Sequence, residues 1–223
     1  MKKLSPLSFQ TLSAPIYNDL MEQLISGAYE PGQRLKLNEL AEQTGTSVSP
    51  VREALIRLVA EDSVAMSSLR AFAIPSLSSS RFNQILSIRL VLEGLAVEKA
   101  TENITQSDVE ELSKLHAKFI SAEANQERLE AQSLNRRIHF MIYERADMPM
   151  LMSSILNLWA KMGPILRVYY SERIDDTRRA PDHLYLFEAL GAKDCSRAVA
   201  AVQADIIHGC SAIGNYIREL EGS

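Results

Sequence analysis

Three of the four histidines in this 223-residue chain fall on helix faces that the surrounding residues mark as buried. His139 follows Asn135 by one helical turn, so the two side chains point the same way. His183 shares a stripe with two leucines and a phenylalanine, and His208 shares one with alanines. Neutral imidazoles and one oxygen ligand suit Zn²⁺, Ni²⁺ or a similar divalent ion. The spacing therefore allows a shared metal site.

Each histidine also has a simpler interpretation as a separate buried imidazole with one hydrogen-bond partner. His116 has no recognisable partner in the sequence and is interpreted as a surface residue. Asp205 lies one turn before His208 and is placed to support a metal ligand as a hydrogen-bonding carboxylate. The alanines around His208 indicate either close helix packing or room for a small ligand.

Arg89 lies on a helix between aliphatic residues and has two interpretations. Its guanidinium can face inward beside a metal and bind a carboxylate ligand through paired hydrogen bonds. Alternatively it forms an ion pair with Glu93, one helical turn further along. The sequence favours neither.

A second kind of chemistry is indicated between residues 37 and 58, which read as two short helices joined by a turn at Gly45. Apolar residues recur at helical spacing in both and predict one buried face. The pattern fits a helix–turn–helix, whose second helix presents its N-terminal end to the DNA major groove. It equally fits an ordinary helical hairpin. The polar residues at this end are Thr46, Ser47, Ser49 and Arg52.

Charge, cysteine content and hydrophobic pattern limit how the chain can bind DNA and in which compartment it can act. The net charge is -4, and residues 1–80 hold seven basic and eight acidic side chains. DNA contact must therefore come from local clustering on one face. The two cysteines have no metal-ligand spacing and are expected to be free thiols. No apolar run approaches the roughly 18 residues of a membrane span, and the N-terminus lacks a signal-peptide core, so we expect a cytoplasmic protein without membrane contact.

The remaining elements must position these groups, and they are almost all helical. Residues 14–26 predict a first helix, and residues 64–66 and 71–74 predict two short strands around a turn. We expect a mainly α fold: a winged helix–turn–helix at 1–75, a linker at 76–80 and an all-helical bundle at 81–223. The helices predicted for the bundle are 80–100, 106–123, 126–145, 149–173, 179–191 and 194–220.

Two stretches of the first domain resemble the GntR family of bacterial regulators. GAYEPGQRLKLNELA is similar to the entry of its winged helix, and SVSPVREAL is similar to its recognition-helix motif. Six helices beginning near LSIRLVLEGLAVEKA resemble the FCD effector domain of the FadR branch. The resemblance implies DNA contacts at Arg34, in the helix–turn–helix and at Arg70 in the wing. It also implies a metal set of Asn135, His139, His183 and His208, with Arg89 near the effector.

The chain departs from the family pattern at four positions. Val48 replaces the usual arginine of the recognition motif, which removes a base contact but allows contact with a thymine methyl. Ala71 and Asp62 stand where glycines are usual, and alanine tolerates positive φ poorly. Asn135 replaces the commoner aspartate, so the metal site is one negative charge short.

We therefore predict a transcriptional repressor that binds a palindromic double-stranded operator as a homodimer. A small carboxylate effector at the metal site would shift its DNA affinity through differential binding to two states. The alternative is a metal-dependent hydrolase in which three histidines activate water, although no general base can be assigned. A third interpretation is a helical interaction protein without a small ligand.

Overall fold

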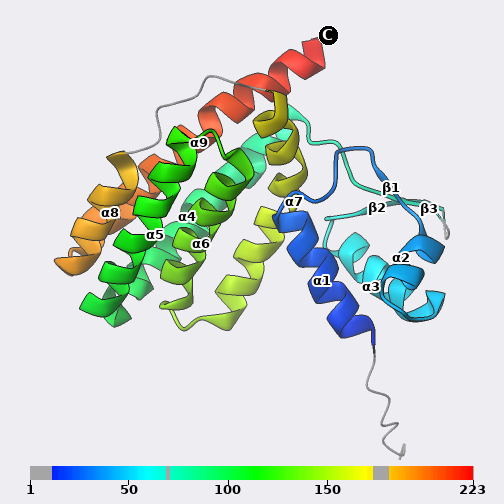
Figure 1. Cartoon of the computed structure of the whole chain (residues 1–223), viewed down its shortest axis with the longest axis horizontal. Coiled ribbons are helices and arrows are strands. Elements are labelled where there is room, and N and C mark those ends of the chain that lie inside the picture. The colour runs from blue at the N-terminus through cyan, green and yellow to red at the C-terminus, as the bar shows by residue number, and fades with distance from the viewer. Residues whose placement is uncertain (1–11, 69–70, 173–180, 223) are drawn as a thin grey trace, which may run out of the picture.

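The computed structural model describes residues 12–68, 71–172 and 181–222, and these form nine helices and three short strands (Figure 1). A small N-terminal unit with the strands lies beside a larger bundle of long helices. The mainly α fold that the sequence predicts is confirmed. The helices are α1 (Ser13–Ile25), α2 (Leu37–Gln43), α3 (Val48–Ala60), α4 (Ser79–Asn103), α5 (Gln106–Ala124), α6 (Arg128–Glu144), α7 (Pro149–Glu172), α8 (Pro181–Gly191) and α9 (Cys195–Gly222).

The strands form one antiparallel sheet in the order β1-β3-β2. They are β1 (Arg34–Leu35), β2 (Ala65–Ser68) and β3 (Ala71–Ala73). The sequence predicts β2 and β3 but not β1, because a two-residue strand has no periodicity to detect. Leu35 pairs with Phe72 across the sheet, and both side chains are buried in the hydrophobic core.

The structure explains how the chain accommodates Asp62 and Ala71 at two positions where glycine is usual in the family. Asp62 adopts positive φ (65°), a conformation that aspartate tolerates better than most residues. Arg81 donates through Nη2 to both the Asp62 carbonyl and its carboxylate, the latter at 2.7 Å. Ala71 lies in β3 and is not among the residues with positive φ. The strain expected at Ala71 is therefore absent.

Local sequence signals set the helix ends in the bundle. Thr105 and Asp108 form a capping box at the start of α5. The Asp194 carboxylate accepts a hydrogen bond from the backbone N–H of Arg197 and so caps α9. Each bundle helix lies within a few residues of its predicted span, because these stop signals act locally.

The two units meet where α1 crosses α7. A Cβ at Gly163 would stand 1.8 Å from the carbonyl oxygen of Leu24, so only glycine allows this approach. Gly27, at the end of α1, has positive φ (72°), and a Cβ there would stand 2.8 Å from the carbonyl oxygen of Gly163 in α7. The crossing fixes the N-terminal unit against the helical bundle.

Candidate metal and DNA-binding sites

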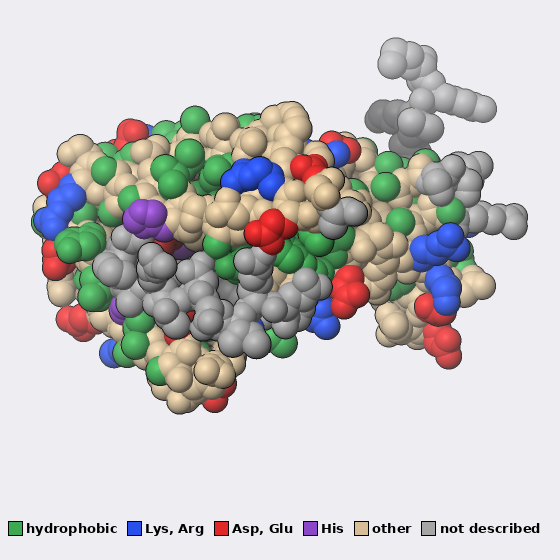
Figure 2. All heavy atoms as spheres, turned by 90° about the horizontal axis from the view of Figure 1, so that it is seen from above, with side chains coloured by type: hydrophobic (Ala, Val, Ile, Leu, Met, Phe, Trp, Pro, Cys, Tyr) green, Lys and Arg blue, Asp and Glu red, His purple; other side chains and the backbone are tan. Residues whose placement is uncertain are grey.

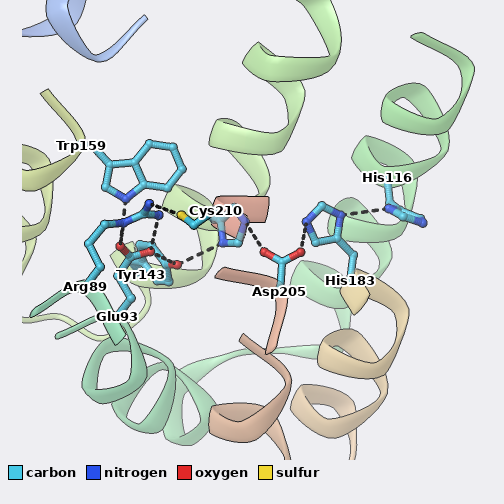
Figure 3. Close-up of polar contacts among 9 residues, drawn as sticks. Arg89, Glu93, His116, Tyr143, Trp159, His183, Asp205 and Cys210 are labelled. Carbon is cyan, nitrogen blue, oxygen red and sulfur yellow. Dashed lines mark hydrogen bonds and ion pairs between the residues drawn. The ribbon is translucent and has the colours of Figure 1, made fainter. Parts of the chain in front are cut away.

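A row of polar side chains that contact one another, here called the polar chain, runs through the interior of the bundle (Figure 3). At its centre, Asp205 of α9 lies between His139 of α6 and His183 of α8. Asp205 Oδ2 is 3.0 Å from His139 Nε2, and Asp205 Oδ1 is 3.6 Å from His183 Nε2. One ligand atom from each residue lies within 4.8 Å of the others. Four positions on three separate helices were expected here, and the structure brings these two histidines together with Asp205.

The hydrogen bonds behind His139 fix which of its nitrogens carries the proton. The Tyr143 hydroxyl donates to Glu93 Oε2 at 2.6 Å. Its oxygen therefore accepts from His139 Nδ1 at 3.0 Å, which leaves Nε2 of the neutral ring with a lone pair. That lone pair faces the Asp205 carboxylate. Two electron-rich groups at this distance are favourable only with a proton or a cation shared between them, so the donor set fits a bound metal ion.

His116 lies at the far end of the polar chain, and the expectation that it is a surface residue is wrong. It is 6% exposed, and its Nδ1 lies 3.2 Å from Nδ1 of His183. Burial lowers its pKa, which favours the neutral imidazole near pH 7. His116 therefore helps to orient the His183 ring. The helical spacing in the sequence indicates this burial, since His116 lies on the same helical stripe as Leu112 and Phe119, which are also buried.

His208 does not face inward as predicted, and its side chain is exposed. It lies two residues from Ile206 and two from Cys210, which are both buried on the inner face of α9. Two residues correspond to about 200° around a helix, so His208 points away from the bundle. The alanine stripe of α9 does not mark its buried face, because exposing an alanine side chain to water costs less free energy than exposing an isoleucine.

Asn135 remains beside the site. It is half-buried and lines a small cavity of about 60 Å³ together with His139 and Asp205. The other walls come from α4, α6, α7 and α9, and include Arg89, Gln132, Trp159, Leu166 and Cys210. A side-chain amide on this wall can offer its oxygen to a cation or its N–H₂ to an anion.

Arg89 forms the ion pair with Glu93 that was one of its two interpretations. Arg89 Nε lies 2.5 Å from Glu93 Oε1, and both side chains are almost fully buried. Glu93 also accepts from Trp159 Nε1 at 3.1 Å, and the Arg89 guanidinium lies over the Trp159 ring. Burial lowers the pKa of Arg89, but the charge and hydrogen bonds of Glu93, together with Cys210 and Tyr143, outweigh burial and raise that pKa. Burial, together with the Glu93 charge, raises the pKa of Tyr143 well above 10.

At the other end of the molecule, the polar residues of the helix–turn–helix face solvent. Ser47 occupies the N-cap position of α3, yet its side chain makes no capping hydrogen bond. Ser47 and Ser49 are exposed, whereas Thr46 and Arg52 are half-buried. A groove beside them is lined by residues of β1, α2, α3 and β3, among them Arg34, Lys36, Val48, Arg52 and Phe72. Arg70 lies outside the described residues.

On the face that Figure 2 shows, acidic and basic side chains are interspersed, and neither sign of charge dominates. This agrees with the net charge of -4. No helix among the described residues is long and apolar enough to cross a membrane.

Comparison with known proteins identifies both halves. Residues 12–74 match the profile described as bacterial regulatory proteins, gntR family, and residues 84–208 match the profile of the FCD domain. The chain belongs to the GntR family of transcriptional regulators and carries an FCD domain. The family resemblance drawn from the sequence motifs is confirmed.

Relatives in the family align with most of the length of this chain. It is 37% identical over 198 residues to the HTH-type transcriptional regulator McbR of Escherichia coli K12, covering 86% of this chain and 89% of McbR. The E. coli McbR/YncC structure has a TM-score of 0.85 at 34% identity and covers 92% of this chain and 98% of its own. The gluconate operon transcriptional repressor of Bacillus subtilis is 26% identical, covering 84% and 79%. These relatives are regulators rather than enzymes, so the hydrolase alternative finds no support.

Proposed function

We propose that this protein is a transcriptional repressor whose operator affinity is set by a small carboxylate bound at a divalent-metal site in the bundle. The main support is the pairing of an exposed helix–turn–helix with a buried His–Asp–His donor set in one chain. Several relatives carry the word repressor in their names, including the gluconate operon repressor and GlaR of E. coli. The domain limits we propose are 1–75 for DNA binding, 76–80 for the linker and 81–223 for effector binding, in a protein that acts in the cytoplasm.

Double-stranded DNA would meet the exposed end of α3. Hydroxyl groups that are not used for capping, such as that of Ser47, are available for phosphates, and Arg52 can reach a phosphate or a base edge. Arg34 lies on the same groove, where it can contact the backbone. We propose that two copies address the half-sites of a palindrome as a homodimer. The remaining candidate contacts are Thr46, Ser49 and Arg70.

A metal ion would be held by His139 Nε2, His183 Nε2 and the Asp205 carboxylate. Asp205 takes the place that the sequence interpretation gave to His208. Asn135 completes the cavity wall and is a further candidate oxygen ligand. Two imidazoles and oxygen ligands suit Zn²⁺ or Ni²⁺. When bound, the ion would offer an open coordination position to a carboxylate.

The effector would be small, because the cavity beside the donor set measures only about 60 Å³. Arg89 lines that cavity, but Glu93 already occupies two of its nitrogens. We therefore propose that Arg89 contributes positive potential and holds the wall in place. Its Nη1, which lies 3.6 Å from Cys210 Sγ, is the nitrogen left to meet a carboxylate.

Helix α7 is suited to carry the state of this cavity to the DNA-binding unit. Trp159 reaches the cavity and donates to Glu93. Asn157 and Lys161 lie two residues to either side, about 200° around the helix, and face α3 instead. The Lys161 ammonium donates to the carbonyl oxygen of Glu61 at 2.6 Å, and Ser63 Oγ bonds to Asn157 Oδ1 at 3.2 Å. A shift of α7 would thus move the end of the recognition helix.

The decisive experiment uses the full chain and duplex DNA from upstream of its own gene. Fluorescence anisotropy should give specific binding that changes with Zn²⁺ or Ni²⁺ and a panel of small carboxylic acids. Absence of any specific site at low salt would overturn the DNA-binding role.

The metal is tested separately by elemental analysis of the protein and its variants. His139→Ala with His183→Ala should abolish retention of Zn²⁺ or Ni²⁺. His208→Ala is the matched control and should retain it. Equal metal content in all three proteins would overturn the proposed ligand set.

A further inference from the structure

A second, larger cavity lies at the junction of the two units. It measures about 260 Å³ and is lined by the end of α1 on one side and by α6 and α7 on the other. It shares three wall residues with the small cavity beside the donor set, namely Gln132, Trp159 and Leu166. The other lining residues are Ile25, Ser26, Ala28, Leu129, Ser133, Arg136 and Arg167. The two cavities therefore lie on either side of the same wall.

Two arginines of the bundle line this larger cavity, and both also reach across to the DNA-binding unit. Arg136 Nη1 of α6 lies 2.5 Å from Glu22 Oε1 of α1. Arg167 of α7 donates from Nη1 to the carbonyl oxygen of Gly27 at 3.4 Å, and its Nε lies 3.8 Å from Glu30 Oε1. Each guanidinium has five donors, so these contacts leave further N–H groups for another acceptor.

We propose that this junction cavity binds the anionic group of a small molecule, a carboxylate or a phosphate, between Arg136 and Arg167. Planar guanidinium groups recognise both kinds of anion through paired hydrogen bonds. The Arg136 side chain is only 19% exposed, so its interaction with an anion there is less screened than at an open surface. The site is distinct from the proposed metal site and needs no metal for binding.

The anion would compete with the DNA-binding unit for the same cations. Glu22 is 60% exposed and pairs with Arg136 of the bundle, so it is the partner that is most easily displaced. A bound anion would therefore release one tie between α1 and α6 and weaken a second, at Arg167. Such a site would give the protein a second input to its DNA affinity, directly at the contact between the two units.

The chain contains one tryptophan, Trp159, and it lines both cavities, so its fluorescence reports binding in either. We would titrate the full chain with inorganic phosphate and with glutarate at constant ionic strength, in the presence of a chelator. Saturable binding is expected for at least one probe. Comparing the two probes distinguishes a phosphate ligand from a carboxylate ligand, and failure of both would overturn the proposal.

Two substitutions that should change probe affinity in opposite directions make the test specific. Arg136→Gln should weaken probe binding about tenfold, as expected for loss of a charged hydrogen bond. Glu22→Gln removes the competing carboxylate and should strengthen binding by roughly threefold or more, which a merely structural pair would not do. Arg137→Gln, an exposed neighbour outside the cavity, is the matched control. Unchanged affinity in Arg136→Gln, or weaker binding in Glu22→Gln, would overturn the assignment.

Because chelator is present throughout, this result is independent of the metal. Binding that persists in His139→Ala would support the junction site even if the proposed metal site failed. Probe binding that disappears in His139→Ala but survives Arg136→Gln would place the anion in the small cavity and overturn the proposal.

Discussion

The polar residues of the helix–turn–helix and those of the bundle differ in what surrounds them. Ser47 and Ser49 face solvent, and Ser47 makes no capping hydrogen bond. Glu93 and His139 are buried, and their polar atoms bond to other side chains. An exposed group can be changed with little effect on folding, whereas a buried network couples several helices. The same kind of substitution should therefore affect binding in one region and stability in the other.

The largest effect is expected at Glu93. Glu93→Leu removes the acceptor of Arg89, Tyr143 and Trp159 and leaves a buried guanidinium without its counter-charge. Breaking such a pair costs about 3–5 kcal/mol of unfolding free energy, which urea denaturation followed by circular dichroism would measure.

Glu98→Ala, on the exposed part of the same helix, should change the unfolding free energy by less than about 0.5 kcal/mol. Equal effects of the two substitutions would remove the distinction between the buried network and the surface.

Gly163→Ala tests the crossing that joins the two regions. The new Cβ would stand 1.8 Å from the Leu24 carbonyl oxygen, so α1 must move away from α7. We expect a loss of about 1–3 kcal/mol, with faster hydrogen exchange in α1 than in the parent protein. Gly191→Ala is the control, since a Cβ there would meet only one atom, at 4.0 Å. Unaltered exchange in α1 would show that the crossing does not hold the DNA-binding unit.

Arg52→Ala should lower DNA affinity by about 1–3 kcal/mol, which is roughly fivefold to over a hundredfold, and leave the melting temperature unchanged. Anisotropy titration and a thermal melt would check both values. Arg57→Ala is a useful contrast, because Arg57 lies over the Tyr17 ring and pairs with Glu61 at the other end of α3. A similar loss of DNA affinity in both variants would refute the assignment of the recognition surface.

The smallest effect is expected in the loss of folding stability at acidic pH. A hydrogen bond from Arg145, together with contacts from Thr105, lowers the pKa of Asp108 to about 2, below its usual value of 3.8. The unfolded chain binds this proton more tightly than the folded one, so the stabilisation is complete above about pH 5 and is lost as pH falls toward 2. Asp108→Asn should therefore lower the urea midpoint at pH 7 and flatten its decline with acid. An identical pH dependence in both proteins would contradict this.

Much of the site was accessible from sequence because it depends on local order. Asn135 and His139 fall one turn apart, and Arg89 and Glu93 do the same, so any helix places each pair together. The buried position of His116 could be obtained in the same way, since it shares a helical stripe with Leu112 and Phe119. The location of His208 could not, because the packing of α9 against its neighbours decides which face of that helix is buried.

The sequence by itself determined the helices, two of the three described strands and the exposed end of the recognition helix, since turns, caps and apolar spacing act within a few residues of one another. The tertiary structure decided that Asp205 rather than His208 joins His139 and His183, because only the packing of α6, α8 and α9 sets which face of each helix meets the others. It also decided that Arg136 and Arg167 meet the end of α1 across a cavity, since these residues are more than a hundred positions away from Glu22 and Gly27 in the chain.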